Sequence, residues 1–380
     1  RLEHEDSESY VSYFTVNAIV GELDFPSSEI FYYQQQQFTF PIDTSMNVEI
    51  VANRKALSTV RNKKKELKDF HPLELQFAPI MAKPAQTTAS KILELIKLDC
   101  RYRRWIKKQL NEISEPISAA IIGGGELLAT NMNFNSAMKI WIEQLHKRKI
   151  PVFLWGIGGG YTNPIYRMRY KSALAKADEI CVRDAYSKQV VEKCYARTPL
   201  SYPDVVFLYG KEKKTHDKNS KGKKVCCNVL SYDYYKNAGG SKSKEEYFDE
   251  WKEILDSYTD SDTIILFSST TIEDRKTTEE FSKKYVWQKS CVSFPDTVDE
   301  YWSQLEDVDY VISGRMHAMI LAMQQGCICV PYEWKDKLEV FKREYCDSGI
   351  ELAKVRRNVE LGFAALKKGI SGLEEDERKA

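Results

Sequence analysis

Hydrophobic residues in the stretch 308–331 predict a strand, a helix and a second strand in succession. Residues 308–313 form a short apolar, β-branched run that Gly314 ends, which is typical of a buried strand. Apolar residues then recur at helical spacing until Gly326, a usual position for a left-handed helix cap. Residues 327–330 form the second buried run. This pattern predicts a strand–helix–strand unit of a parallel sheet.

The same alternation of strand-like and helix-like segments extends along most of the chain. Apolar runs predict strands at 10–20, 48–51, 117–122, 152–155, 179–182, 225–230, 263–267 and 292–294. Helical periodicity predicts helices at 87–113, 135–147, 245–256, 298–305 and 349–366. Alternation in two blocks predicts an α/β protein of two doubly wound, Rossmann-like domains that face a cleft, a GT-B-like architecture.

The length of 380 residues suits two domains. We predict an N-terminal α/β domain at 1–207, a basic linker at 208–224 and a C-terminal α/β domain at 225–380. Residues 211–224 of this linker are rich in lysine and contain no interleaved aromatic residue, so we expect a solvated segment and no nucleic-acid arm. The net charge of +1 gives no overall attraction to nucleic acid or to an anionic membrane.

Nine cysteines are scattered along the chain without a C-x-x-C pair. An odd number without regular spacing argues against both a disulfide framework and a zinc site. We therefore predict no metal site.

Two cationic side chains, Arg315 and His317, lie where the helix after Gly314 begins. Free backbone N–H groups and the helix dipole already make this place electropositive, so cations are unfavourable there unless an anion binds. A bound anion would meet backbone donors, a guanidinium and an imidazole together. A surface arginine with a structural histidine is the alternative, and we favour the anion site.

Further candidates lie just after predicted strands. Glycine runs at 123–125 and 156–160 allow close approach of a ligand to the backbone, although a tight turn explains such runs equally well. Arg183 ends a strand, which favours ligand binding, whereas Asp184 is a natural helix cap. The hydroxyls of 268–271 predict a phosphate contact or a helix cap.

The stretch Ser313-x-Arg315-Met316-His317-Ala318, followed by Gly326 and Lys337, resembles the C-terminal signature of the polysaccharide pyruvyltransferase family. Both glycine turns, the Val-Arg-Asp-x-x-Ser segment at 182–187 and Asp204 also match family motifs. The resemblance covers roughly residues 115–345. Ile328 and Trp334 depart from the family pattern, which has Pro and Tyr there.

This resemblance implies transfer of pyruvate from phosphoenolpyruvate to a sugar, expected to be a terminal galactose of a glycan. A cyclic pyruvate ketal forms and phosphate is released. The chain looks closest to the fungal galactose-residue pyruvyltransferases. The resemblance implies that His317 and Arg315 are the catalytic residues. It implies no cofactor besides the donor substrate phosphoenolpyruvate. The expected substrate-binding residues are Arg183, Lys337, Ser313, Gly124, Gly125, Glu126, Gly158, Gly159, Asp204, Ser269 and Glu333.

The resemblance assigns the donor to the C-terminal domain and the acceptor to the N-terminal domain. A galactose-containing glycan is the expected partner, without nucleic acid. A fungal member would work in the Golgi lumen behind an N-terminal membrane anchor that this sequence lacks, and a bacterial one in the cytoplasm.

Two other functions remain open at this point. A GT-B glycosyltransferase would use Arg315 and His317 for the diphosphate of a nucleotide sugar, and Glu333 for its ribose. A non-catalytic protein on the same scaffold would bind a glycan or an anion. Phosphate release from phosphoenolpyruvate separates the three functions.

Overall fold

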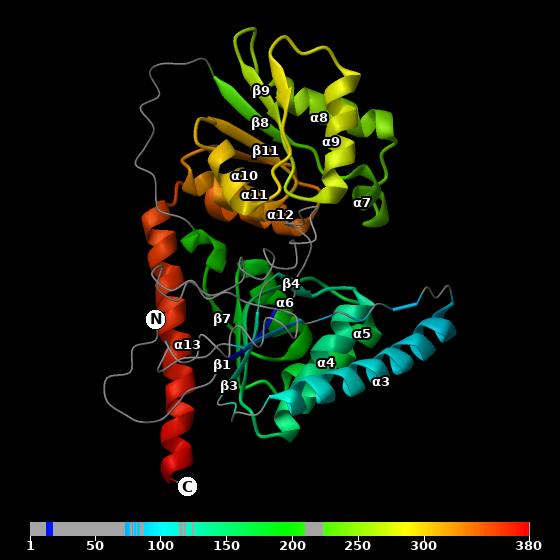
Figure 1. The fold of residues 1–380 in the computed structure, drawn as a ribbon, viewed down its shortest axis with the longest axis vertical. Helices are drawn as coiled ribbons and strands as arrows, with labels where there is room; N and C mark the ends of the chain where they lie inside the picture. The colour runs from blue at the N-terminus through cyan, green and yellow to red at the C-terminus, as the bar shows by residue number, and fades with distance from the viewer. Residues whose placement is uncertain are drawn as a thin grey trace. The chain divides into compact units, whose positions relative to one another are not determined.

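The computed structural model describes residues 13–17, 73–76, 78, 80, 82–83, 87–113, 117, 119–123, 125–209 and 223–379. These residues form two compact units, shown in Figure 1. Unit 1 holds the described residues up to 205 together with 357–379, and unit 2 holds 206–356. The division lies close to the predicted boundary at 207. It differs from the prediction at the C-terminus, where residues from 357 onward belong to unit 1.

Unit 1 is built on a parallel sheet with the strand order β2-β1-β3-β5-β6-β7 and with β4 paired to β5. The strands are β1 (Tyr13–Asn17), β2 (Leu73–Gln76), β3 (Ala119–Gly123), β4 (Glu126–Leu128), β5 (Val152–Gly159), β6 (Glu179–Val182) and β7 (Leu200–Ser201). The helices between them are α3 (Thr88–Glu112), α4 (Met132–Lys147), α5 (Pro164–Leu174) and α6 (Ala185–Tyr195). These four helices share one apolar core with the sheet, and Leu366 and Ile370 of α13 (Leu352–Lys379) pack on its other face.

Unit 2 is built on a second parallel sheet, with the strand order β10-β9-β8-β11-β12. Its strands are β8 (Lys224–Asn228), β9 (Ile264–Phe267), β10 (Ser290–Val292), β11 (Tyr310–Ser313) and β12 (Ile328–Pro331). Its helices are η1 (Val205–Leu208), α7 (Tyr232–Asn237), α8 (Lys244–Asp256), α9 (Ile272–Lys284), α10 (Val298–Gln304), α11 (Met316–Gln324), α12 (Asp336–Phe341) and η2 (Lys342–Cys346). The predicted fold class, two doubly wound α/β domains of the GT-B-like type, is confirmed, while the cleft stays a prediction.

The element 308–331 forms as predicted. Strand β11 ends at Ser313, α11 begins at Met316, and β12 follows. Gly326 has φ +80°, the left-handed conformation that glycine adopts at little cost.

Helix α3 was predicted almost to its ends from apolar residues at helical spacing, Ile92 and Ile96 among them, but these two do not lie on its buried face. Ile92 and Ile96 are 41% and 56% exposed, whereas Leu98 is fully buried. Asp99 lies on the buried side because Arg169 and Lys139 donate to its carboxylate at 2.6 Å and 2.8 Å. A charged residue that is neutralised inside cannot be recognised from hydrophobic spacing alone.

Strand β5 is longer than the predicted 152–155, since it continues through the glycine run to Gly159. The run was predicted to be a turn because glycine is unfavourable in strands. The short strand β4 pairs with Gly158 and Gly159 and keeps the backbone extended.

Helix α13 also runs past the predicted end at 366. The predicted strand at 48–51 and residues 210–222 of the basic linker lie outside the described residues.

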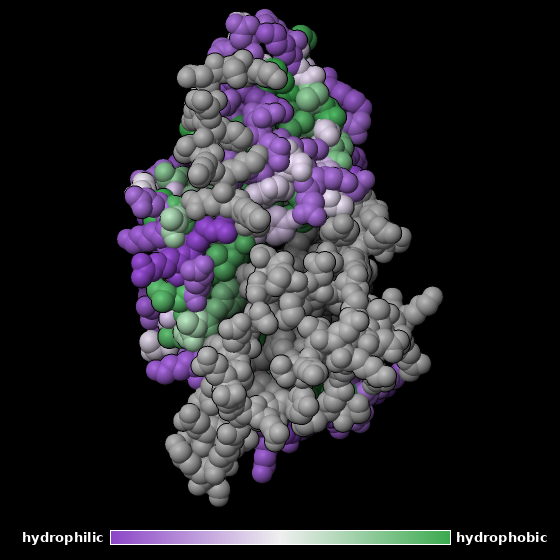
Figure 2. Space-filling view, turned by 60° about the vertical axis from the view of Figure 1, so that its left-hand side comes forward, coloured by the Kyte–Doolittle hydropathy of each residue, from purple (hydrophilic) through white to green (hydrophobic). Residues whose placement is uncertain are grey.

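Figure 2 shows hydrophilic and hydrophobic residues interspersed on the visible face of the molecule. No helix in the described part of the chain combines the length and the apolar character needed to cross a membrane. All nine cysteines lie within the described ranges, and none forms a disulfide bond.

Candidate functional site

The strand order of unit 2 places its candidate site between β8 and β11. The chain adds β9 and β10 on one side of β8 and then returns to add β11 and β12 on the other. Ligands of doubly wound sheets bind at the carboxyl ends of the strands where the order reverses in this way. Here Asn228 and Ser313 stand in register as the last residues of β8 and β11, and both are fully buried.

Arg315 follows β11 directly and is held by a carboxylate from α9. Its Nε donates to Oδ2 of Asp274 at 2.7 Å, and its Nη2 donates to Oδ1 at 2.8 Å. The backbone N–H of Ser231 donates to the same carboxylate at 2.7 Å. Arg315 is 2% exposed and Asp274 is fully buried, so this is an internal ion pair.

The ion pair keeps Arg315 charged. Burial alone would lower the pKa of Arg315, but the Asp274 carboxylate raises it above the usual value. The guanidinium also lies over the ring of Tyr234, 4.7 Å from its centroid. Asp274 takes only the edge formed by Nε and Nη2. The opposite edge, with both Nη1 hydrogens, is therefore turned away from Asp274, and such an edge suits a carboxylate or a phosphate.

The first turn of α11 completes this arrangement. Arg315 occupies the N-cap position, and its side chain makes no capping hydrogen bond. Ser313 instead accepts the Arg315 N–H on its Oγ at 3.0 Å. His317 is 1% exposed. A guanidinium, an imidazole and the positive end of a helix dipole thus lie within three residues, as the sequence predicted.

Lys337 lies in the first turn of α12, which follows β12. Because the strands are parallel, this turn lies at the same edge of the sheet as Arg315, one strand further out. Desolvation lowers the pKa of Lys337 from 10.5 to about 8. A lysine with such a pKa changes its charge within the range in which an enzyme assay is practicable.

Two other predicted residues have local partners. The Ser269 hydroxyl donates to the carbonyl of Thr271 at 2.6 Å and accepts the Thr271 N–H at 3.2 Å, so it shapes the turn before α9. Glu333 is exposed and pairs with Lys342 at 2.6 Å. Their substrate contacts stay predictions.

Sequence analysis missed Asp274 and Asn228. The available signal for Asp274 was the helix-start pattern Thr271-x-x-Asp274, which predicts a cap and nothing about Arg315. Asn228 is the first polar residue after an apolar run. Its amide donates weakly to Thr270 at 3.5 Å, and its Oδ1 accepts no hydrogen bond from the described residues. We add both residues to the candidate site.

In unit 1 the structure brings Arg183 and Asp204 together. Arg183 follows β6 and donates through Nη1 to Oδ2 of Asp204 at 2.9 Å, and both side chains are buried. A Cβ at Gly158 would lie 2.9 Å from Nε of Arg183, so this glycine makes room for the guanidinium. Asp184 caps α6, since it accepts the Ser187 N–H at 2.6 Å.

The two glycine runs contact each other. Gly125, with φ +65°, accepts the Gly158 N–H on its carbonyl at 2.7 Å. A Cβ at Gly159 would lie 2.6 Å from that of Leu128. Parts of the protein therefore fill the spaces that we expected a ligand to approach. Glu126 begins β4, and Gly124 lies outside the described residues.

Comparison with known families supplies the decisive observation. The model of the polysaccharide pyruvyl transferase family matches residues 53–336, about three quarters of the chain. The chain belongs to this family. The match takes in Arg183, Asp204, Arg315 and His317 and begins well before residue 115, where the recognisable motifs start. Lys337 lies directly after its end.

Solved structures to which the chain is similar include MurG of Acinetobacter baumannii (11% identity, 97% of this chain and 95% of that chain, TM-score 0.41). Two UDP-GlcNAc 2-epimerases are also similar. That of Methanocaldococcus jannaschii has 12% identity over 92% and 91% of the chains, with a TM-score of 0.44. That of Neisseria meningitidis, bound to UDP-GlcNAc, has 10% identity over 97% and 100%, with a TM-score of 0.47. No conclusion about this chain's activity follows from these values. No curated protein sequence matches the chain.

The ion pair leads to a stability prediction. Replacing Asp274 by Ala leaves the Arg315 charge buried without its partner, which we expect to lower the free energy of unfolding by about 3–5 kcal/mol. The double variant Asp274→Leu/Arg315→Met should recover much of this loss, because it removes both charges. Urea unfolding followed by tryptophan fluorescence measures the difference. Equal stability of the single and double variants would contradict the prediction.

Lys337 leads to a prediction about pH. Below about pH 8 its ammonium is charged and attracts an anionic substrate, and above this pH it loses the proton. We therefore expect kcat/KM for an anionic donor to fall by about tenfold per pH unit above this value, a limiting slope of one proton. Lys337→Arg should abolish the fall because arginine stays protonated. The same inflection in this variant would exclude Lys337 as its cause.

Proposed function

We propose that this pyruvyl transferase uses phosphoenolpyruvate as donor and a terminal galactose of a glycan as acceptor, and that it forms a cyclic pyruvate ketal. The family supports pyruvyl transfer to a polysaccharide. The donor follows from the chemistry of the site in unit 2. Galactose follows from the resemblance of the sequence to the fungal members, which also leads us to propose the Golgi lumen as its compartment.

The observation that carries this proposal is the held guanidinium of Arg315. Phosphoenolpyruvate presents a carboxylate and a phosphate close together. Binding both groups requires several oriented donors in one place. Asp274 fixes one edge of Arg315, and the other edge, the start of α11 and Lys337 lie at the carboxyl edge of one sheet. No cofactor is required for this binding.

The reaction needs one proton donor and one proton acceptor. A proton adds to the methylene carbon of phosphoenolpyruvate while one sugar hydroxyl attacks the neighbouring carbon. A second hydroxyl then attacks the same carbon, and the bond to the phosphate oxygen breaks. The two hydroxyl groups release two protons. One replaces the proton that was added to the methylene carbon, and the other leaves with phosphate. We assign the proton transfer to His317, because an imidazole can donate or accept a proton near neutral pH.

A direct assay tests this function. The protein is mixed with phosphoenolpyruvate and a β-galactoside, and phosphate release is measured together with the mass of the sugar. We expect equal amounts of phosphate and of a sugar that has gained one pyruvate less one water. Arg315→Lys should lose most of this activity, because a point charge cannot replace the planar fork. Turnover of a nucleotide sugar without phosphoenolpyruvate would instead support the glycosyltransferase alternative.

His317 has a separate test. Its replacement by Gln keeps a hydrogen-bond donor but removes the group that can move a proton, so we expect kcat to fall by about 10²-fold or more. The KM for phosphoenolpyruvate should change little. Kinetics across pH 5–9 check both values. Near-normal turnover with an unchanged pH profile would leave His317 with a binding role at most.

A further inference from the structure

A cavity lies in unit 2, along the edge of its sheet that β12 forms. Its volume is about 910 Å³, within the ~300–1,000 Å³ typical of small-ligand sites. The five consecutive residues 328–332 line it, although neighbouring side chains of a strand point to opposite faces. The cavity therefore follows the edge of β12, with α8 on one side and η2 on the other.

The edge of β12 offers a few backbone hydrogen-bonding groups. The N–H groups of Ile328 and Tyr332 donate to the carbonyls of Asp309, directly before β11, and of Ser313 at its end, at 2.8 Å and 2.9 Å. Because alternate residues of a parallel strand turn to opposite sides, Cys329 and Pro331 turn their backbone groups toward the cavity. Pro331 has no N–H. One donor and two acceptors are thus presented, which is too few for another strand but suitable for hydroxyl groups.

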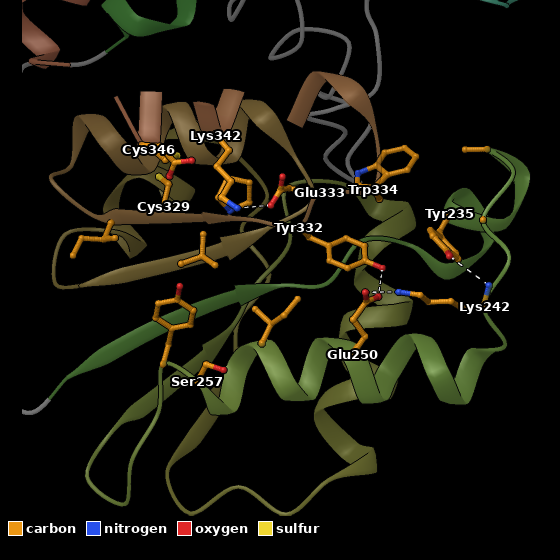
Figure 3. Close-up of a pocket in the computed structure, with 18 of the residues that line it drawn as sticks. Tyr235, Lys242, Glu250, Ser257, Cys329, Tyr332, Glu333, Trp334, Lys342 and Cys346 are labelled. Atoms are coloured by element: carbon orange, nitrogen blue, oxygen red, sulfur yellow. Dashed lines mark hydrogen bonds and ion pairs between the residues drawn. The ribbon is translucent and has the colours of Figure 1, made fainter. Parts of the chain in front are cut away.

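The side chains around the cavity combine aromatic and apolar surface with two lysine–glutamate ion pairs and one further acid, Asp347. Figure 3 shows Lys242 beside Glu250, and Lys342 beside Glu333. Tyr332 donates its hydroxyl to Glu250 at 2.6 Å. These ion pairs are partly exposed. Replacing their contacts by hydrogen bonds to ligand hydroxyls therefore costs little free energy. A neutral, hydroxyl-rich ligand fits this lining better than a phosphate or another polyanion.

The apolar part of the lining suits the carbon-bound hydrogens of a sugar ring. Ile328 is 44% exposed, and Trp334 and Tyr258 line the cavity as well. Aromatic faces combined with hydrogen-bonding groups at their edge can hold such a ring by packing and orientation together.

Trp334 connects the cavity to the donor site. It lines the cavity, and its Nε1 donates to the carbonyl of Gly314 at 3.0 Å, next to Arg315. A ligand that lies along β12 is therefore close in the structure to the turn that begins α11.

We propose that this cavity is an accessory subsite that binds internal, neutral sugar residues of the acceptor glycan, away from the sugar that receives pyruvate. The inference rests on the proposed function for the identity of the glycan. Its physical basis is the hydroxyl-compatible edge of β12 together with the ion pairs and the exposed apolar surface. A peptide strand and a nucleotide are the alternative occupants.

Ser257 provides a way to block the cavity. It is exposed at the C-cap of α8 and lines the cavity, so Ser257→Trp adds bulk inside it without disturbing the core. Ser303 is an exposed serine near the end of α10 that does not line the cavity, and Ser303→Trp is the matched control. Ile328→Lys, which changes the opposite wall, is the second test variant.

Binding is measured first, without phosphoenolpyruvate, by affinity electrophoresis in galactomannan. We expect wild type and Ser303→Trp to be retarded equally. Both cavity variants should bind galactomannan at least about tenfold more weakly, a loss of affinity of the size expected when one buried contact is lost. Retardation of the cavity variants equal to that of the wild type would overturn the proposal. Loss of UDP binding or of binding to an extended hexapeptide in these variants, with galactomannan binding unchanged, would overturn it as well.

Kinetics then separate this subsite from the proposed activity. In the cavity variants the KM for galactomannan should rise about tenfold, while the KM for phosphoenolpyruvate and for methyl β-galactoside stays unchanged. Weakened galactomannan binding in a protein that never releases phosphate would support the subsite and reject the proposed function. Normal turnover with an unchanged galactomannan KM in both variants would reject the subsite alone.

Discussion

An ionised guanidinium inside a protein needs a carboxylate beside it, since moving an isolated charge out of water costs several kcal/mol. Asp274 meets this requirement for Arg315 and fixes the direction of the guanidinium at the same time. The turn after β11, the first turn of α9 and the ring of Tyr234 are all held by this one pair. The candidate site of unit 2 therefore depends on a residue that has no part in the recognised family signature.

Unit 1 contains a similar pair. Arg183 follows a strand, as Arg315 does, and Asp204 from a different segment holds it. Gly158 leaves space for its guanidinium, so one of the family's glycine turns serves the arginine directly. In each unit, an arginine that resembles a ligand-binding residue is first a structural one. For Arg315, the edge turned away from Asp274 is what a substrate can use.

The two candidate binding regions of unit 2 have different electrostatics. At the start of α11 positive charge gathers around one carboxylate, which favours an anionic donor. In the cavity along β12, two lysines pair with two glutamates beside a third acid, Asp347, which favours a neutral chain of sugars over an anion. Trp334 lies between them and contacts Gly314. A transferase that joins an anion to a glycan needs both kinds of surface.

The sequence alone determined the secondary structure around Gly314 and Gly326, the α/β class and the family motifs, because these depend on local spacing, caps and turns. It also located Arg315 and His317 at a helix start. Only the tertiary structure decided that Asp274, 41 residues before Arg315, holds it. The two residues follow β9 and β11, which folding places on either side of β8. It likewise decided which residues of α3 are buried and that β4 keeps the glycine run of β5 extended. Such pairings depend on which strands become neighbours, and local periodicity contains no information about that order.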